Sequence, residues 1–284
     1  MMRLGFLANA VDDIERASRL GFDAVELHAS AFLGTDGAYD PAIVQRALQL
    51  CREVRVEITA IAHYWLAGRQ PTIEEITASY GRVFDLAEEL GVDTVASMSG
   101  FDPSRDWAGN LALFGERFTP LAREAERRGL RIALENWMGF GGPLPHVPVN
   151  MGGAPATWEA MFRLVPSYAL GIEYDPSHLY WQGIDYVSAL IEFREKIFHV
   201  HAKDTEILPA ERHRHGINGR WFRFRIPGYG EIDWTRLVTA LDEIGYSGGV
   251  VIEHEDPVYQ GERFEEGLLR GWETLPSLIQ PGGR

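Results

Sequence analysis

The stretch RGLRIALE, Arg128 to Glu135, carries the pattern that decides the fold. Gly129 follows a helical segment, and a glycine at this place adopts the left-handed conformation that ends a helix. The run that follows is mostly apolar, which is typical of a strand buried on both faces of a parallel sheet. Glu135 then places a carboxylate at the end of that strand.

The order of helix, glycine and short apolar strand recurs around Gly21, Gly91 and Gly245. Amphipathic helical segments fill the spaces between the predicted strands. Eight such units in about 250 residues predict a single (β/α)8 TIM barrel, an α/β fold. A doubly wound sheet is the alternative, but no glycine-rich dinucleotide fingerprint follows the first strand. The predicted strands are residues 3–8, 23–28, 57–63, 92–97, 130–135, 169–175, 197–202 and 249–253.

No linker interrupts this repeating order of strands and helices, so residues 1–284 are predicted to form one domain. Two connections between a strand and the next helix are unusually long: residues 139–155 after strand five, and an insertion, residues 205–231, after strand seven. Both follow strand C-termini, where barrels build active sites and long loops act as lids or binding loops. Alternation in the insertion predicts a two-stranded flap packed on the barrel, and a direct anion site is the alternative, which could coexist with the flap. Its two faces would carry Phe222, Phe224 and Ile226 on one side and Trp221, Arg223 and Arg225 on the other.

The composition is that of an ordinary soluble protein, with 45% hydrophobic and 24% charged residues and a formal net charge of −14. An acidic surface repels phosphate backbones, so a nucleic-acid partner is not expected. The sequence shows neither a run of about 20 apolar residues nor the apolar core of a signal peptide, so no membrane association is expected. Cys51 is the single cysteine, which precludes an internal disulfide and agrees with a cytoplasmic location.

The predicted strand seven and the residues that follow it place two histidines and a lysine close together in FHVHAKD, Phe198 to Asp204. Alternate residues of a strand share a face, so His199, His201 and Lys203 point the same way. His199 alone is more typical of a core histidine or one that supports a ligand. Lys203 could also pair with a nearby acid.

Carboxylates at the ends of the neighbouring strands supply the partners of His201. Glu135 ends strand five, Asp175 ends strand six and Glu253 ends strand eight. These acids would repel one another in a barrel mouth unless a cation lay among them. Two Glu, one Asp and one His suit Mn²⁺ first, or Mg²⁺, Co²⁺ or Zn²⁺. Any one of them could instead form a salt bridge or a helix cap.

Several motifs together resemble those of the sugar phosphate isomerase/epimerase superfamily, the xylose isomerase-like TIM barrels. The motifs are ALEN with Glu135, DPSH with Asp175 and His178, HVHAKD with His201, PGYGEIDW at 227–234, and VIEHE with Glu253. The superfamily includes ketose 3-epimerases, hydroxypyruvate isomerase, inosose dehydratase and endonuclease IV. The resemblance extends over essentially the whole chain.

The resemblance implies that Glu135, Asp175, His201 and Glu253 bind a divalent metal and that His178 faces the substrate. Glu135 and Glu253 would double as the catalytic acid–base pair. The implied reaction is isomerisation or epimerisation of a small sugar or keto-polyol, by proton abstraction next to a carbonyl and a cis-enediolate. The resemblance also implies a homo-oligomer, because relatives are often dimers or tetramers.

One position departs from the ketose 3-epimerase pattern. Those enzymes carry an arginine six positions after the ligand histidine, where this chain has Ile207. Lys203 is therefore the first candidate for the contact with a substrate oxygen, and an arginine of residues 212–225 is the second. His63, Trp137 and Trp181 follow strand ends and could contact a sugar, although each could serve packing alone.

Three other functions stay open at this stage. Elimination from a keto-sugar, keto-inositol or 3-keto-glycoside would make the protein a dehydratase or lyase, which HVHAKD and the insertion favour. A nuclease like endonuclease IV needs further histidines and an Asp-x-His pair, which residues 211–215 do not supply. A sugar-binding protein without turnover is the remaining alternative.

Overall fold

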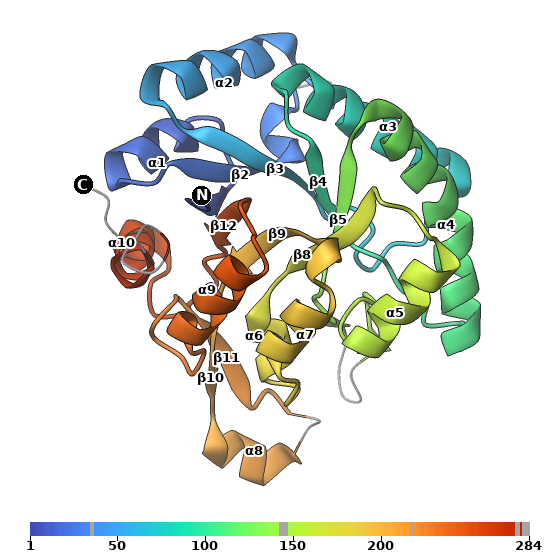
Figure 1. Cartoon of the computed structure of the whole chain (residues 1–284), viewed down its shortest axis with the longest axis vertical. Coiled ribbons are helices and arrows are strands. Elements are labelled where there is room, and N and C mark those ends of the chain that lie inside the picture. The colour runs from blue at the N-terminus through green and yellow to red at the C-terminus, as the bar shows by residue number, and fades with distance from the viewer. Residues whose placement is uncertain (35–36, 142–146, 217–218, 276–278, 280–284) are drawn as a thin grey trace.

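The computed structural model describes residues 1–34, 37–141, 147–216, 219–275 and 279. Eight parallel strands form a closed barrel in the order β1-β12-β9-β8-β5-β4-β3-β2 (Figure 1). This confirms the predicted (β/α)8 class. The barrel strands are β1 (Arg3–Ala8), β2 (Ala24–His28), β3 (Glu57–His63), β4 (Thr94–Ser97), β5 (Arg131–Glu135), β8 (Leu170–Tyr174), β9 (Ile197–Ala202) and β12 (Gly249–Ile252).

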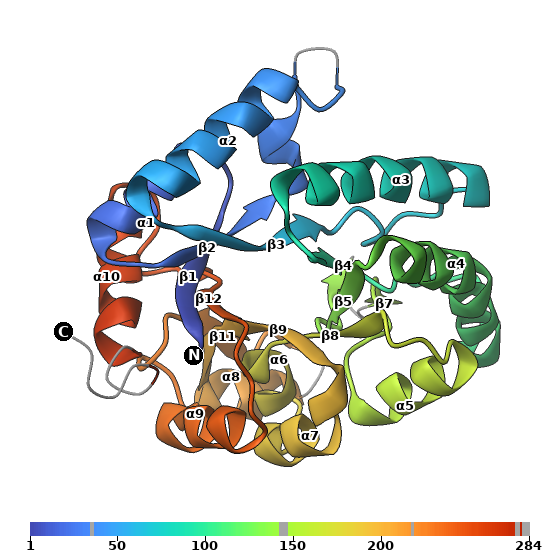
Figure 2. The same cartoon turned by 45° about the horizontal axis from the view of Figure 1, so that its top comes forward.

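Helices surround this barrel, except that α8 lies away from it beyond β10 and β11 (Figures 1 and 2). The helices are α1 (Asp13–Leu20), α2 (Pro41–Val54), α3 (Ile73–Leu90), α4 (Trp107–Arg128), α5 (Pro155–Leu164), α6 (Pro176–Tyr180), α7 (Tyr186–Glu192), α8 (Pro209–His215), α9 (Trp234–Glu243) and α10 (Phe264–Thr274). Short 3₁₀ turns occur at η1 (Ala29–Phe32), η2 (Arg194–Lys196) and η4 (Gly261–Arg263). One apolar stripe of each long helix is buried against the strands, as Ile76, Tyr80, Val83 and Ala87 of α3 illustrate.

The glycines that follow α1, α3 and α4 have the expected left-handed backbone. Gly21, Gly91 and Gly129 have φ angles of 89°, 70° and 68°. After α3 the amide of Val92 still donates to the carbonyl of Ala87, 2.9 Å away. For this reason β4 begins at Thr94, two residues later than the sequence pattern suggested.

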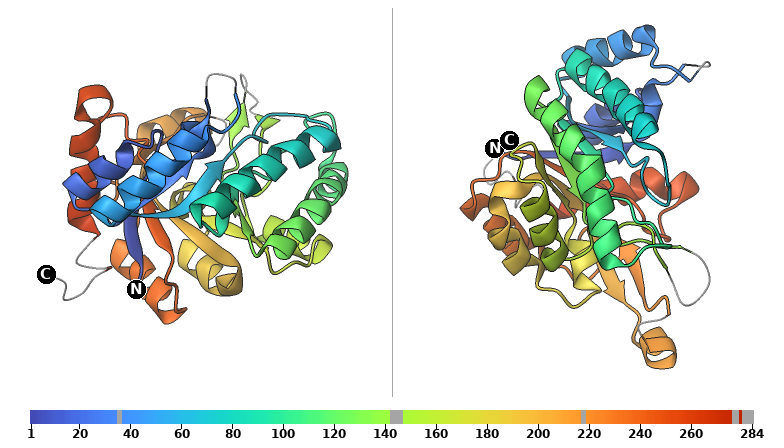
Figure 3. Two further views of the ribbon diagram at one scale, coloured as in Figure 1. Left: turned by 90° about the horizontal axis from the view of Figure 1, so that it is seen from above. Right: turned by 90° about the vertical axis from the view of Figure 1, so that its right-hand side faces the viewer.

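Two small antiparallel sheets lie outside the barrel. β10 (Asp204–Ile207) pairs with β11 (Phe222–Arg225), and β6 (Phe140–Gly141) pairs with β7 (Val147–Pro148). The first of these, with α8, extends away from the barrel (Figure 3). The predicted insertion, residues 205–231, thus contains a two-stranded flap, although residues 217–218 within it lie outside the described residues. Residues 142–146 of the second predicted loop also lie outside them.

No helix in the described part of the chain combines the length and the apolar character needed to cross a membrane.

Candidate active site

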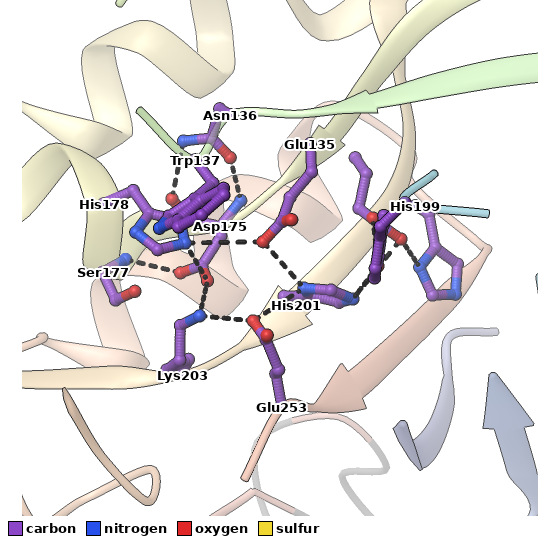
Figure 4. Close-up of polar contacts among 12 residues, drawn as sticks. Glu135, Asn136, Trp137, Asp175, Ser177, His178, His199, His201, Lys203 and Glu253 are labelled. Carbon is purple, nitrogen blue, oxygen red and sulfur yellow. Dashed lines mark hydrogen bonds and ion pairs between the residues drawn. The ribbon is translucent and has the colours of Figure 1, made fainter. Parts of the chain in front are cut away.

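The C-terminal ends of four neighbouring strands bring the four predicted ligands together (Figure 4). Glu135 is the last residue of β5, and His201 lies within β9. Asp175 and Glu253 directly follow β8 and β12. One ligand atom from each residue lies within 4.8 Å of the others, which is a spacing that a single cation can bridge.

Unsatisfied polar atoms surround the same point. Asp175 Oδ2, His201 Nδ1 and both ring nitrogens of His178 are buried without a hydrogen bond of normal geometry. His201 Nδ1 lies 3.1 Å from Glu253 Oε2 and 3.7 Å from Glu135 Oε1. Buried polar groups nearly always have partners. This donor set therefore fits a hard or borderline divalent cation held by three carboxylates and one imidazole.

Lys203 brings an ammonium group to the same carboxylates. Its Nζ lies 3.1 Å from Asp175 Oδ2 and 3.0 Å from Glu255 Oε2, and it also contacts Glu253. Burial disfavours the charge, but Asp175, Glu253 and Glu255 outweigh burial and raise the pKa of Lys203 well above its usual value. Lys203 is therefore a buried, charged donor within the site.

The two glutamates of the cluster are held in their ionised form. Burial would raise the pKa of Glu253, but Lys203 and His201 lower it well below its usual value. Burial and the nearby Glu253 raise the pKa of Glu135, yet His178, His201 and Lys203 bring it below the ordinary range. An ionised carboxylate can accept a proton, so both glutamates are in the form that a general base requires.

His178 lies at the wall of this cluster. Its Nε2 is 3.4 Å from Glu135 Oε1 and 3.3 Å from Asp175 Oδ2. The ring of Phe224, from the flap, meets the ring of His178 edge to face at 5.1 Å and lies 4.5 Å from Lys203 Nζ. The flap thus covers the two polar groups that the sequence assigned to the substrate.

The flap separates its aromatic side chains from its charged ones. Phe222 stacks on Trp181 at 4.6 Å, next to Phe224. Arg223 pairs with Glu206, and Arg225 pairs with Glu206 and Asp256. These two arginines therefore have carboxylate partners on the protein, as Lys203 does.

Trp221 does not lie with the arginines, as the alternation had suggested. Its ring meets that of Trp181 at 6.2 Å and that of Phe222 at 5.7 Å. The prediction that Trp221 lies on the opposite face from Phe222 is wrong, because both rings pack on Trp181.

Asp204 links two of the sequence motifs, HVHAKD and PGYGEIDW. Its buried carboxylate accepts hydrogen bonds from the amides of Thr205, Gly228 and Ile232 and from Trp234 Nε1, at 2.8 to 3.0 Å. The 228–234 loop is thereby fixed to the end of β9. Asp204 is a structural residue, and the sequence had assigned it no role.

Asn136 is a second residue that the sequence analysis missed. Its side-chain amide donates to the carbonyl of Asp175 at 2.8 Å and accepts from the amide of Asp175 at 2.6 Å. This pair joins the ends of β5 and β8 and sets the spacing between Glu135 and Asp175. Its position directly after a ligand in ALENW was the only available signal.

A second layer of buried polar groups lies one strand repeat deeper in the barrel. Glu173 and His199 precede Asp175 and His201 by two residues, so they point to the same side of their strands. Glu26 on β2 joins them, and Tyr64 Oη lies 3.1 Å from Glu26 and 2.7 Å from Glu173. Glu26 and Glu173 were missed, although each is a lone acid within an apolar strand.

The pKa values of these two acids move in opposite directions. Burial and Glu26 raise the pKa of Glu173 well above its usual value. Burial acts on Glu26 as well, but His201 and His199 outweigh it and lower the pKa of Glu26. Glu173 is thus favoured in its neutral form, and Glu26 is favoured as a carboxylate.

The remaining predicted substrate contacts lie around the mouth of the barrel. Trp181 follows α6 and stacks on the flap, and Trp137 follows β5, with its indole ring over Gly139. His63 bonds to Ser79 at 2.9 Å and stacks on Trp65, lining a cavity of about 380 Å³. The described contacts of His63 are with this cavity wall and not with the four ligands.

Comparison with known proteins agrees with this geometry. The family model described as "Xylose isomerase-like TIM barrel" matches residues 14–272. The chain belongs to the xylose isomerase-like TIM barrel family. This confirms the resemblance on which the site residues were chosen.

Named relatives of this xylose isomerase-like chain include enzymes. Inosose dehydratase of Bacillus velezensis is 36% identical over 98% of this chain and 95% of its own. The uncharacterized protein YfiH of Bacillus subtilis is 32% identical over 56% of this chain, which spans only 50% of that protein. A solved structure of D-psicose 3-epimerase superposes with a TM-score of 0.74 over 99% of this chain and all of its own, at 17% identity. At that identity the last comparison supports the fold alone.

Proposed function

We propose that this protein is a divalent-metal-dependent enzyme that removes a proton from the carbon next to a carbonyl of a small keto-polyol or keto-sugar. One observation carries the proposal. Glu135 and Glu253 reach a common point from different strands, and the buried donors Asp175 and His201 complete a four-ligand set there.

The four residues Glu135, Asp175, His201 and Glu253 would hold the metal, with Mn²⁺ the first candidate. The chemistry that a bound cation would supply there is Lewis-acid polarisation of the substrate, which would acidify the carbon–hydrogen bond next to the carbonyl. Ionised Glu135 or Glu253 then accepts the proton as general base. His178 and Lys203 are placed to donate hydrogen bonds to substrate oxygens, and the flap with Trp137 and Trp181 limits access of water.

Dehydration is the outcome that we favour. Lys203 supplies a charged N–H donor, fully buried beside the base Glu253. The base takes the proton from the α-carbon, the electron pair forms a carbon–carbon double bond, and the hydroxyl on the β-carbon leaves as water with a proton from Lys203. Proton return from the glutamate to Lys203 restores the enzyme. The similarity to inosose dehydratase, which covers both chains almost entirely, supports this order of candidates.

Epimerisation or isomerisation is the second candidate, and it is the outcome that the sequence motifs had placed first. Two ionised glutamates at one centre can remove a proton and return one from another direction. Return to the same carbon inverts it, and return to the neighbouring carbon exchanges aldose and ketose. In this case Lys203 would only bind a substrate oxygen.

One experiment separates the two outcomes. Mn²⁺-loaded protein is incubated in D₂O with keto-inositols and with a panel of ketoses, and products are followed by NMR. Loss of water with a new double bond establishes dehydration, while deuterium beside the carbonyl in an epimer or aldose establishes the alternative. Glu135→Gln and Glu253→Gln should slow both reactions by about 10²- to 10⁴-fold. The proposal fails if the metal-loaded protein neither exchanges nor converts any compound, or if Glu135→Gln leaves turnover unchanged.

In a dehydratase, Lys203→Met should keep deuterium exchange and lose water elimination. The two functions are therefore distinguished by one variant as well as by product analysis.

A further inference from the structure

His201 is the only one of the four ligands that also contacts the deeper polar layer. Its Nδ1 faces Glu253 and Glu135, whereas its Nε2 lies 2.9 Å from Glu26 Oε2 and 3.4 Å from Glu173 Oε1. The imidazole ring thus has one nitrogen on each layer, as Figure 4 shows.

This arrangement fixes which nitrogen can bind a cation. An imidazole nitrogen binds a metal through its lone pair, so Nδ1 must be free of a proton and Nε2 must carry the remaining one. That Nε2–H then donates to the carboxylate of Glu26. A carboxylate behind a ligating histidine sets its tautomer, fixes its ring orientation and makes it a better donor.

The other residues of the layer hold Glu26 in place. Tyr64 Oη lies 3.1 Å from Glu26 Oε1 and 2.7 Å from Glu173 Oε2. His199 Nδ1 lies 3.0 Å from Glu173 Oε1, and its Nε2 lies 3.0 Å from Thr59 Oγ1. The side chains of Glu26, Glu173 and His199 are all buried.

A second metal ion is the alternative occupant, because one ligand atom each from Glu26, Glu173, His199 and His201 also lies within 4.8 Å of the others. The hydrogen bonds oppose this assignment. Among the described residues, the buried side-chain atoms that form no hydrogen bond include Asp175 Oδ2 and His201 Nδ1 of the upper cluster, but no atom of Glu26, Glu173 or His199. The deeper layer is a closed network, and the upper cluster has the open donors.

We propose that Glu26 is a positioning residue that holds His201 with its proton on Nε2 and its Nδ1 directed at the metal. This inference rests on the proposed metal-dependent function. It assigns Glu26 a role in metal affinity without contact to metal or substrate, and it assigns the deeper layer no ion of its own.

Three variants test the role of Glu26 by Zn²⁺ and Mn²⁺ affinity, measured by competition with a chelator. Glu26→Leu keeps the size and removes the acceptor, so metal should bind about 10- to 100-fold more weakly. Glu26→Gln keeps a neutral acceptor and should restore affinity to within a few-fold of wild type. Glu173→Gln is the matched control, because Glu173 is equally buried but lies farther from His201 Nε2, and it should bind metal nearly as wild type does. Urea unfolding of each variant separates metal affinity from stability.

NMR spectroscopy of the wild-type protein tests the same proposal without a variant, so the test remains available even if Glu26→Leu does not fold. In the Zn²⁺-loaded protein, ¹⁵N NMR of the histidine rings should show His201 protonated at Nε2 and metal-bound at Nδ1, and the reverse arrangement would overturn the proposal. Equal affinity of wild type and Glu26→Leu would also overturn it. So would two ions per wild-type chain, with one lost in Glu26→Leu. Metal binding by wild type without turnover of any tested compound would refute the proposed function and leave this inference intact.

Discussion

Replacement of Lys203 by methionine should strengthen metal binding while it weakens dehydration. The ammonium of Lys203 and a divalent cation would neutralise the same oxygens, those of Asp175 and Glu253. Methionine keeps the length of the side chain and its packing against Phe224, but it removes the positive charge. The two cations repel each other, so loss of the ammonium should favour the metal.

The magnitude follows from the contacts. Nζ is 3.1 Å from Asp175 Oδ2, and oxygen ligands lie about 2.0 to 2.6 Å from such metals, so the two cations would be at most about 6 Å apart. Two unit charges 4 Å apart repel by about 4 kcal/mol at an effective dielectric constant of about 20. Without Lys203 the carboxylates hold protons more tightly, and these must leave when metal binds, which offsets part of the gain. We expect a net gain of about 1.4 to 2.8 kcal/mol, a dissociation constant about 10- to 100-fold lower.

Isothermal titration of Mn²⁺ into metal-free protein at pH 7 measures this effect. Lys196→Met is the matched control, since Lys196 precedes β9 and donates to Ser167 and Leu170 carbonyls away from the cluster. It should leave the affinity unchanged. An affinity of Lys203→Met equal to or weaker than that of wild type would refute the electrostatic reasoning, because it would mean that the ammonium helps to assemble the ligands and does not compete with the metal.

Three further predictions concern single residues of the site and its support. Glu253→Gln should slow deuterium exchange at the substrate carbon by about 10²- to 10⁴-fold at saturating metal, as expected for loss of a general base; exchange at the wild-type rate would remove Glu253 from that role. Asp204→Asn should lower the free energy of unfolding in urea by about 2 to 4 kcal/mol, because each carboxylate oxygen accepts from two N–H donors and two of the four donors would therefore face an amide N–H₂; a loss below about 0.5 kcal/mol would contradict the structural role. Burial lowers the pKa of His63 from 6.5 to about 4, so as the pH falls through this window the unfolded chain takes up a proton that the folded chain does not. The free energy of unfolding of wild type should therefore fall by up to about 3 kcal/mol over this pH range, and that of His63→Gln should not show this loss. An equal dependence of unfolding free energy on pH in the two proteins would contradict the prediction.

The barrel could be predicted because its determinants are local. Apolar runs such as Ile132 to Leu134 favour strands buried on both faces, and glycines with positive φ end the helices before them. Glu135, Asp175 and Glu253 could be chosen for the same reason. A parallel barrel brings the C-terminal ends of all its strands to one face, so residues at those ends meet whatever the details of packing.

The deeper layer could not be predicted in this way. Glu26 and His201 are 175 residues apart, and their 2.9 Å contact depends on the register of β1, β2, β9 and β12 around the barrel. The sequence shows only one acid within the apolar run AVEL, which a strand could equally direct toward a helix. The placement of Phe224 against His178 likewise depends on how the flap folds back, and no local pattern specifies this contact.

The deeper layer should mainly affect metal affinity, and the residues above it should mainly affect the reaction. Below His201, Glu26 supports the ligating imidazole, so a substitution of Glu26 should change how tightly the metal is held and leave substrate preference unaltered. Above it, Lys203, His178 and the flap contact the space next to the ligands, so substitutions there should change product and substrate preference. His201 belongs to both layers, because its Nδ1 faces Glu253 and Glu135 and its Nε2 faces Glu26. A substitution at His201 should therefore abolish metal binding and catalysis together, whereas changes at Glu26 and Lys203 should separate the two.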